Sequence, residues 1–385
     1  MSRAVDLSFI PLLDAAPLIV ADRMGFAEEE RLAIRLHRAR TWSMLRDMLA
    51  LGQVDAAQML SAVPIAGRLG LGGAAVDFET ALVLSLGGQV IGVSPALADD
   101  LRGAGLRIDF RDALAARDAL LRARPAGLRF GVPFPFSMHA ELLHLWLGDM
   151  PGLSTVTVPP PQIAEALLAG EIEAFCVGEP WGSSAVSQRL AELLLPGTAI
   201  WTAAPEKVLA TRRGWFEANP DRGGALMRAV WRACRWLDQP ESRATASEML
   251  ARDDALAIEP EVIERALSSR LLLSATGDGV DSPGFIAFHD GAANFPWRSQ
   301  AAWIGRQMSQ RLRLDADAAM RIAQSVWRPD LYRQHLGDVA VLPAASAKVE
   351  GACPQPILAG ANRGTVLLGR NQFFDGRIFD LLPGG

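Results

Sequence analysis

Five residues of this sequence have groups suited to holding a small ligand: Trp42, Gln89, His139, Gly178 and Lys207. They are polar or aromatic residues, or a glycine, close to predicted strand ends and helix starts. In an open α/β sheet such positions face the crevice in which ligands bind. Indole, amide, imidazole, backbone N–H and ammonium groups can all donate hydrogen bonds. Together they would form a set of donors around a ligand that accepts hydrogen bonds.

Each of the five also has an ordinary structural explanation. Trp42 can be a packing residue at the start of a helix, and Gln89 can bond across a hinge. His139 can be structural, and Gly178 can serve the turn in Cys176-Val-Gly-Glu-Pro-Trp181. Lys207 is, by base rate, a solvated surface lysine. Taken singly, none of these residues establishes a site.

Patterns of known catalytic and metal sites are incomplete in this chain. His139-Ala-Glu141 matches one half of a zinc deaminase motif, but the P-C-x-x-C half is missing. His139 and His144 are five residues apart rather than the four that place two zinc ligands on one helical face. The chain has no P-loop, no G-x-G-x-x-G after a strand and no G-x-S-x-G. We therefore predict a protein that is not an enzyme and that uses no metal and no cofactor.

The elements that must position the five residues follow an α/β pattern, in which short apolar strands alternate with amphipathic helices and the sheet is mainly parallel. Thr41 is a good N-cap for a helix that starts at Trp42. The predicted strands are Val5–Ile10, Ala33–His37, Ala81–Ser85, Val90–Val93, Leu128–Val132, Thr155–Val158, Ala174–Val177 and Val208–Thr211. The predicted helices are Trp42–Leu51, Gln58–Leu69, Ala113–Arg124, His139–Gly148, Gln162–Ala169, Gly224–Leu237, Arg243–Ala251 and Pro260–Ser268.

Two interruptions of this pattern predict a chain that crosses twice between two lobes. One is Gly87-Gly88-Gln89, inside an apolar segment, and the other is Trp201–Glu206. We expect a discontinuous first lobe of residues 1–88 and 203–385, with a second lobe of residues 89–202 inserted into it. This is the plan of a clamshell that binds its ligand between the lobes. The stretch Val341–Pro356 is expected to be an extended arm.

Composition narrows the class of protein further. The 385 residues carry a formal net charge of -5 without a basic stripe, so we expect no direct contact with nucleic acid.

The longest uncharged stretch, Thr80–Ala98, contains glycines, a glutamine and a proline, so it predicts two buried strands rather than a membrane helix. Met1-Ser-Arg-Ala leads directly into the first strand, which predicts no leader. The three cysteines are far apart and form no C-x-x-C pair, which is typical of reduced thiols. We expect a soluble, cytoplasmic protein.

Several segments in order along the chain resemble the nitrate- and bicarbonate-binding proteins of bacterial ABC transporters. The segments are Pro11–Leu18, Met24-Gly-Phe26, Thr41–Asp47, Gly52–Met59, Val177-Gly-Glu-Pro-Trp181, Pro205-Glu-Lys207, Asn294–Gln300 and Phe373–Asp380. The resemblance covers nearly the whole chain. It implies the periplasmic-binding-protein clamshell (type II), in agreement with the two predicted crossings.

The resemblance also implies a ligand and a set of residues that holds it. In the nitrate-binding members a tryptophan, a glutamine, a histidine, a glycine backbone and a lysine hold the anion. Matching motif to motif places these roles on Trp42, Gln89, His139, Gly178 and Lys207. The bicarbonate-binding members have an acidic residue where Lys207 stands, so the resemblance favours nitrate or nitrite over bicarbonate.

Members of this family that are exported carry a leader. In its expected lack of one, this chain resembles the cytoplasmic nitrate/nitrite sensors of the NasS type. This implies that an ANTAR-domain RNA-binding antiterminator is the partner, released when the anion binds. The rival interpretations are a nitrate-binding component of an ABC importer and an enzyme of the pyrimidine-precursor type that shares the fold. Location in the cell distinguishes the first rival, and a turnover assay distinguishes the second.

Overall fold

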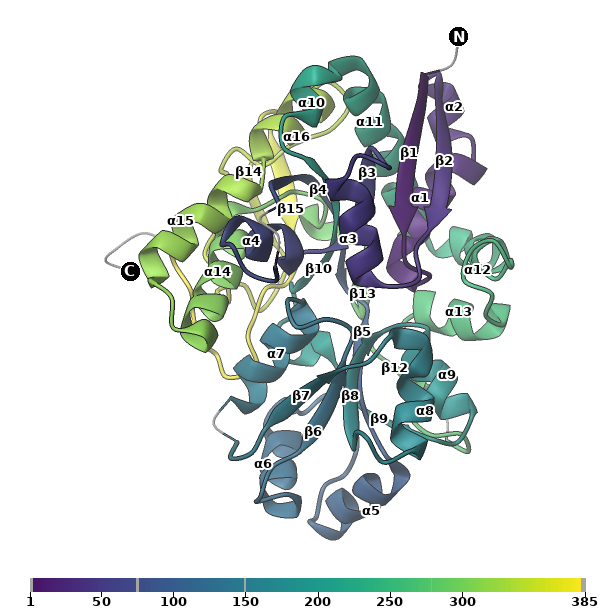
Figure 1. The fold of residues 1–385 in the computed structure, drawn as a ribbon, viewed down its shortest axis with the longest axis vertical. Helices are drawn as coiled ribbons and strands as arrows, with labels where there is room; N and C mark the ends of the chain where they lie inside the picture. The colour runs from purple at the N-terminus through teal and green to yellow at the C-terminus, as the bar shows by residue number, and fades with distance from the viewer. Residues whose placement is uncertain (1–2, 74–75, 149, 278, 382–385) are drawn as a thin grey trace.

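The computed structural model describes residues 3–73, 76–148, 150–277 and 279–381. Residues 1–2, where the sequence is expected to lead directly into the first strand, lie outside the described residues, as do residues 74–75, 149, 278 and 382–385 of the expected lobes. The chain folds into two lobes, each built around one large sheet with helices packed against it (Figure 1).

The first lobe contains a six-stranded sheet. Its strands, in spatial order, are β13 (Ile286–Ala287), β4 (Phe78–Gly87), β10 (Pro205–Arg212), β3 (Ala56–Leu60), β1 (Arg3–Phe9) and β2 (Leu32–Arg38). The helices of its sequence range are α1 (Ala16–Arg23), α2 (Phe26–Glu29), α3 (Trp42–Ala50), α4 (Ala62–Arg68), α10 (Trp215–Ala218), α11 (Pro220–Leu237), α12 (Arg243–Leu250), α13 (Pro260–Leu267), α14 (Arg298–Leu312), α15 (Ala316–Val326) and α16 (Pro329–Leu336).

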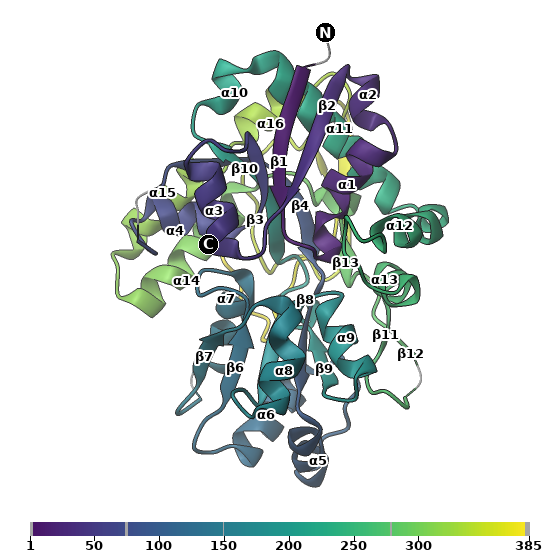
Figure 2. The ribbon, with the colours of Figure 1, turned by 45° about the vertical axis from the view of Figure 1, so that its right-hand side comes forward.

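The second lobe contains a five-stranded sheet. Its strands, in spatial order, are β7 (Ser154–Thr157), β6 (Arg129–Val132), β8 (Ala174–Gly178), β5 (Gln89–Val93) and β9 (Glu192–Pro196). Its helices are α5 (Pro95–Gly103), α6 (Ala113–Ala123), α7 (Met138–Leu147), α8 (Ile163–Leu168) and α9 (Trp181–Ser187). The hairpin of β11 (Arg270–Leu272) and β12 (Gly279–Asp281) follows β10 in sequence but lies beside this second sheet (Figure 2). Leu193 N, on β9, donates to Leu273 O, directly after β11.

The prediction of mainly parallel sheets holds for most strands of each sheet, but β10 and β13 in the first sheet and β5 in the second run against the other strands. In the first sheet β10 runs antiparallel to both of its neighbours, β3 and β4. In the second sheet β5 runs antiparallel to both β8 and β9. These two strands follow the two passages of the chain between the sheets. Each therefore enters its sheet from the side of the other lobe, against the direction of the strands it joins.

The predicted helix Gln58–Leu69 is also wrong in its first part, because the chain forms β3 there and α4 begins only at Ala62. All five residues of β3 are buried between β1 and β10, so no polar residues alternate with apolar ones. Alanine, glutamine, methionine and leucine also favour helices intrinsically. A short buried strand of these residues cannot be told from a helix by periodicity.

The chain passes between the sheets directly after β4 and again between β9 and β10. At the first passage Gly87 and Gly88 have φ angles of 66° and 85°, a left-handed conformation that favours glycine. A methyl group on Gly87 would lie 2.4 Å from Phe285 O. The stretch Thr80–Ala98 contains the two expected strands, most of β4 and all of β5, followed by the start of α5. Among the described residues, none of the helices has the length and apolar character that a membrane span requires.

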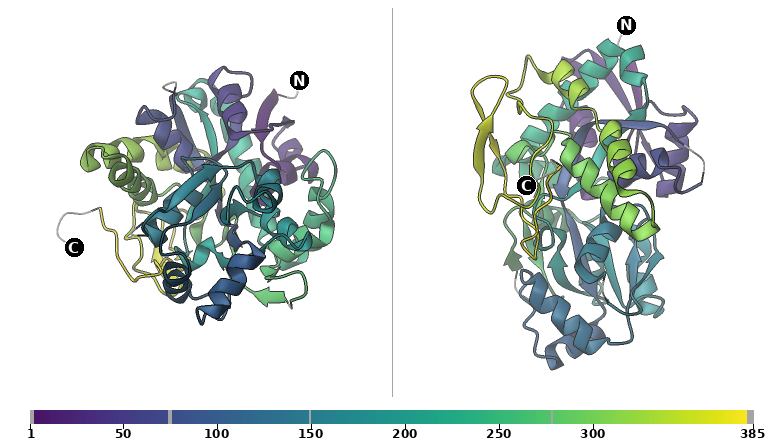
Figure 3. Two further views of the ribbon diagram at one scale, coloured as in Figure 1. Left: turned by 60° about the horizontal axis from the view of Figure 1, so that its bottom comes forward. Right: turned by 90° about the vertical axis from the view of Figure 1, so that its left-hand side faces the viewer.

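The C-terminal segment lies against both lobes on the outside of the molecule (Figure 3). Residues 341–356, the expected extended arm, contain isolated bridges rather than regular elements. After the hairpin of β14 (Ile357–Gly360) and β15 (Thr365–Leu368), the segment reaches the second passage. There Trp201 Nε1 donates to Asn371 Oδ1 at 2.8 Å, and Phe374 N donates to Ile200 O.

Candidate functional site

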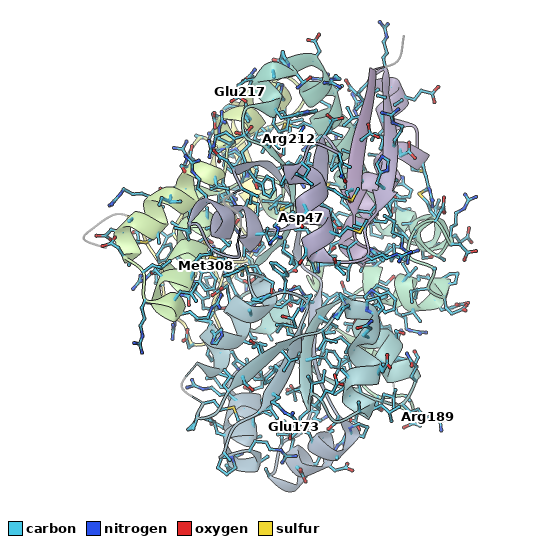
Figure 4. The ribbon with its side chains drawn as sticks, viewed as in Figure 1. Asp47, Glu173, Arg189, Arg212, Glu217 and Met308 are labelled. Atoms are coloured by element: carbon cyan, nitrogen blue, oxygen red, sulfur yellow. The ribbon has the colours of Figure 1, made fainter. Side chains whose placement is uncertain are left out.

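Two helix starts and the ends of three strands place the five residues singled out from the sequence. Thr41 accepts a hydrogen bond from Met44 N and so fixes the first turn of α3, which begins at Trp42. At the other end of α3, Arg212 donates to the carbonyl oxygens of Leu49 and Val54, and its position is marked in Figure 4. The predicted start of this helix is confirmed. Ser137 caps α7 in the same way, two residues before His139.

The structure brings all five residues together at the junction of the two sheets. Gln89 is directly opposite Gly178 in the ladder between β5 and β8. A methyl group on Gly178 would lie 4.0 Å from His139 Nε2, so that ring nitrogen faces the end of β8. From the first lobe, the Lys207 ammonium lies 5.4 Å from the centre of the Trp42 ring. The two lobes therefore contribute to one cluster.

Three of these side chains bury polar atoms that have no hydrogen-bond partner. The atoms are Nε1 of Trp42, Nε2 and Oε1 of Gln89, and both ring nitrogens of His139. Buried polar atoms are nearly always satisfied, so each of these needs an explanation. A single unpartnered indole is not distinctive, since Trp297 and Trp327 have one too. Three such side chains beside one ammonium group are the pattern expected around a ligand.

Lys207 is fully buried, so its base-rate interpretation as a solvated surface lysine is wrong. Its Nζ donates to Asp14 Oδ2 at 2.7 Å and to Glu206 Oε1 at 2.6 Å. Sequence reasoning missed both carboxylates. The available signal was a charged residue inside the apolar run Pro11-Leu-Leu-Asp-Ala-Ala. An ammonium group has three N–H donors, so these two bonds leave one for a ligand.

The charges of this cluster are set by burial and by mutual contact. Burial raises the pKa of Asp14 and of Glu206, although Lys207 opposes the effect on both. Burial alone would lower the pKa of Lys207, but the two carboxylates outweigh it and raise that pKa. Burial, followed by the charge of Lys207, holds the pKa of His139 well below its ordinary value. The imidazole is therefore neutral at neutral pH.

A cleft of about 630 Å³ opens beside this cluster, between the two lobes. One wall belongs to the first lobe and includes Trp42, and the other belongs to the second lobe. Of the five residues only Trp42 lines this cleft, and its Nε1 atom is itself buried. The lining residues are Ile10, Pro11, Arg38, Ala39, Arg40, Thr41, Trp42, Ser43, Pro133, Phe134, Thr157, Pro159, Pro160 and Pro161. Within the described ranges, no three histidine, cysteine or acidic side chains gather so as to hold a metal ion.

Glu179, next to Gly178, makes the stability of the fold depend on pH. Its buried carboxyl group accepts hydrogen bonds from the backbone and hydroxyl of Ser183, and burial raises its pKa from 4.5 to about 7. The native protein therefore holds a proton that the unfolded chain releases, and stability falls as pH rises from 4.5 through 7. The loss of stability is about 3 kcal/mol at 1.36 kcal/mol per pKa unit.

We expect Glu179→Gln to remove this fall in the free energy of unfolding, measured by chemical denaturation at pH 5 and pH 8. Equal pH dependence in variant and parent would contradict the assignment.

The paired sheets, the two passages and the cleft between the lobes define a periplasmic-binding-protein fold. The crystal structure of the periplasmic nitrate-binding protein NrtA from Synechocystis PCC 6803 superimposes with a TM-score of 0.83 at 25% identity, covering 98% of this chain and 95% of that one. The chain belongs to the NMT1-like family, whose model matches residues 1–251.

Two relatives extend the comparison in sequence. The chain is 32% identical over 346 residues to the nitrate import ATP-binding protein NrtC of Synechocystis sp., covering 86% of this chain. It spans about half the length of that relative, with 50% covered. It is 28% identical over 391 residues to the nitrate/nitrite binding protein NrtA of Nostoc sp., covering 97% of this chain and 82% of that protein. These relatives are named for binding and import rather than for catalysis.

Proposed function

We propose that this protein binds nitrate or nitrite between its lobes and catalyses no reaction. The observation that carries the proposal is the group of buried, unpartnered polar atoms on Trp42, Gln89 and His139 beside the Lys207 ammonium. The backbone N–H of Gly178 would complete the set. The names of the NrtA relatives support the choice of ligand.

The chemistry of nitrate fits such a set of donors. Nitrate is planar, carries one negative charge and only accepts hydrogen bonds. A buried anion needs donors and a nearby positive charge, which the remaining N–H of Lys207 supplies. Each charge-assisted bond contributes roughly 1.5–3 kcal/mol. A few of them therefore suffice for micromolar binding, which requires about 8 kcal/mol.

Isothermal titration with nitrate, nitrite and bicarbonate in chloride-free buffer tests this proposal. We expect micromolar binding of nitrate or nitrite and none of bicarbonate. Binding of bicarbonate alone would move the assignment to the bicarbonate-binding branch of the resemblance. Absence of binding of both nitrate and nitrite would reject the five-residue site.

Gly197 offers a test that leaves the donors themselves intact. A methyl group on this residue would lie 2.6 Å from Cγ and Cδ of Gln89, so Gly197→Ala must displace that side chain. The loss of one hydrogen bond to a charged ligand is worth about 1.5–3 kcal/mol, and we expect nitrate affinity to fall roughly tenfold to a hundredfold. Gly103→Ala is the control, since its added methyl group would meet nothing within 4 Å. Equal affinity of both variants would show that Gln89 does not contact the anion.

We further propose that the protein is a cytoplasmic sensor whose partner is an ANTAR-domain antiterminator. In this proposal residues 89–202 close as a unit on residues 1–88 and 203–385 around the anion, and closure lowers the affinity for the partner. The anion shifts this equilibrium only by its preference for the closed form. The support is the resemblance to nitrate/nitrite sensors. Size-exclusion chromatography with the antiterminator should show a complex that nitrate dissociates.

The alternative is a nitrate-binding component of an ABC importer. The names of the NrtC and NrtA relatives favour it, since one is an import ATP-binding protein and the solved structure is of a periplasmic protein. Fractionation of the producing cells distinguishes the two proposals. A sensor must be recovered with the cytoplasm, and an importer component with the periplasm or the membrane.

A further inference from the structure

The charges around Lys207 do not balance for an anionic ligand. With Asp14 and Glu206 ionised, His139 neutral and Lys207 protonated, the cluster has a net charge of -1 before any ligand binds. All four side chains are buried. A nitrate ion would bring the total to -2, and repulsion between buried charges is weakly screened. Binding therefore needs one further positive charge in the cluster.

A neutral His139 has one N–H too few for its two expected contacts, Glu206 and the anion. Its Nδ1 lies 3.3 Å from Glu206 Oε1 without forming a hydrogen bond, whereas its Nε2 faces Gly178. A neutral imidazole donates from one nitrogen and presents a lone pair on the other. If Nε2 donates to an anion, the lone pair of Nδ1 faces a carboxylate oxygen. If Nδ1 donates to Glu206, Nε2 has no hydrogen for the anion. One added proton satisfies both contacts.

The other groups of the cluster are poorer acceptors for this proton. Asp14 uses both of its oxygens, one for Lys207 and one for Gln58. Cys176, on β8, is buried and its pKa is raised well above its ordinary value, so it stays a neutral thiol. Glu206 differs, because its Oε2 is buried and has no partner. Glu206 and His139 are thus the pair with room for a proton.

We propose that the anion binds together with one proton, which is held between His139 and Glu206. This rests on the proposed nitrate or nitrite site and adds a proton as a second ligand of it. The complex then holds one proton more than the empty protein. Affinity for the anion consequently rises as pH falls, by about tenfold per pH unit where the empty pair is unprotonated.

The test is titration calorimetry with nitrate, which stays an anion between pH 6 and pH 8.5. In two buffers of different ionisation enthalpy, the heats should report uptake of one proton per nitrate bound, and the dissociation constant should rise about tenfold per pH unit. In Glu206→Gln the amide can donate to Nδ1 while Nε2 donates to the anion. Affinity of this variant should not change with pH.

Glu179→Gln is the matched control, because Glu179 is a buried carboxyl group outside the cluster whose pKa of about 7 lies in the same range. It should keep the full pH dependence. Binding of nitrate to the parent protein without proton uptake overturns this inference and leaves the proposed function standing, as does a pH slope unchanged in Glu206→Gln. Absence of binding of both nitrate and nitrite at every pH overturns both. The proton count needs no variant, so it decides the question even if Glu206→Gln fails to fold.

Discussion

Replacing Lys207 with methionine is expected to abolish measurable nitrate binding and to destabilise the fold. The substitution removes the positive charge and leaves Asp14 and Glu206 facing each other without a cation. Breaking a buried ion pair by removing one partner costs about 3–5 kcal/mol. Loss of the charge-assisted bond to the anion alone would weaken binding by roughly 1.5–3 kcal/mol. Denaturant unfolding and calorimetric titration measure the two effects separately.

Two further variants separate binding from folding. Lys207→Met combined with Glu206→Gln removes one of the two unpaired carboxylates, so it should regain stability without regaining affinity. Lys348 is the other lysine of the sequence, and its ammonium lies 4.9 Å from the centre of the Trp297 ring, away from this cluster. Lys348→Met should bind nitrate normally. Full affinity in Lys207→Met would remove Lys207 from the proposed site.

The second large effect is expected at a contact that joins the lobes outside the ligand cluster. Arg311 on α14 donates to Glu141 Oε1 on α7 at 2.6 Å and to Pro135 O at 3.2 Å. Glu141 is fully buried, and without Arg311 its carboxylate would be uncompensated. Arg311→Met should therefore favour separation of the lobes, where Glu141 regains water. Each 1.4 kcal/mol lost from closure lowers affinity about tenfold, so we expect at least a tenfold loss.

Small-angle scattering and nitrate titration together measure this effect. The radius of gyration without ligand should increase in Arg311→Met, and saturating nitrate should restore it. Arg306→Met is the matched control on the same helix, because Arg306 lies over the Phe379 ring at 5.6 Å rather than against α7. Recovery of affinity in Glu141→Gln combined with Arg311→Met would support the buried charge as the cause. Parental affinity in Arg311→Met would contradict it.

Much of the scaffold of the site could be predicted from the sequence because its signals are local. Thr41 and the apolar spacing after it predict where α3 begins, and the glycine pair at Gly87-Gly88 predicts the first passage. The position of Gln89 directly after that pair predicts a polar group at the junction. These signals depend on capping, on turn conformation and on burial of a strand, which neighbouring residues determine.

The remainder depends on contacts between residues distant in sequence. The direction of β10 and β5 follows from which lobe each strand enters, and no local pattern contains that information. Lys207 is predicted to be solvated by base rate, and its burial is tolerable because it donates to Asp14, 193 positions away, as well as to its neighbour Glu206. The strand β3 is buried on both faces, so it lacks the alternation that would identify it. Tertiary structure overrides local preference at these positions.

The second sheet is formed by one inserted segment of the chain, and the two ends of this segment lie side by side. Its first strand, β5, and its last strand, β9, are direct neighbours, with Val90 opposite Pro196. The two points where the chain enters and leaves this sheet are thus about one strand spacing apart, roughly 4.8 Å. Exchange of the inserted segment, residues 89–202, between relatives would replace Gln89, His139 and Gly178 in one step while Trp42 and Lys207 remained. Under the proposed site, three of the five donors can therefore change while the outer surface of the first lobe stays the same.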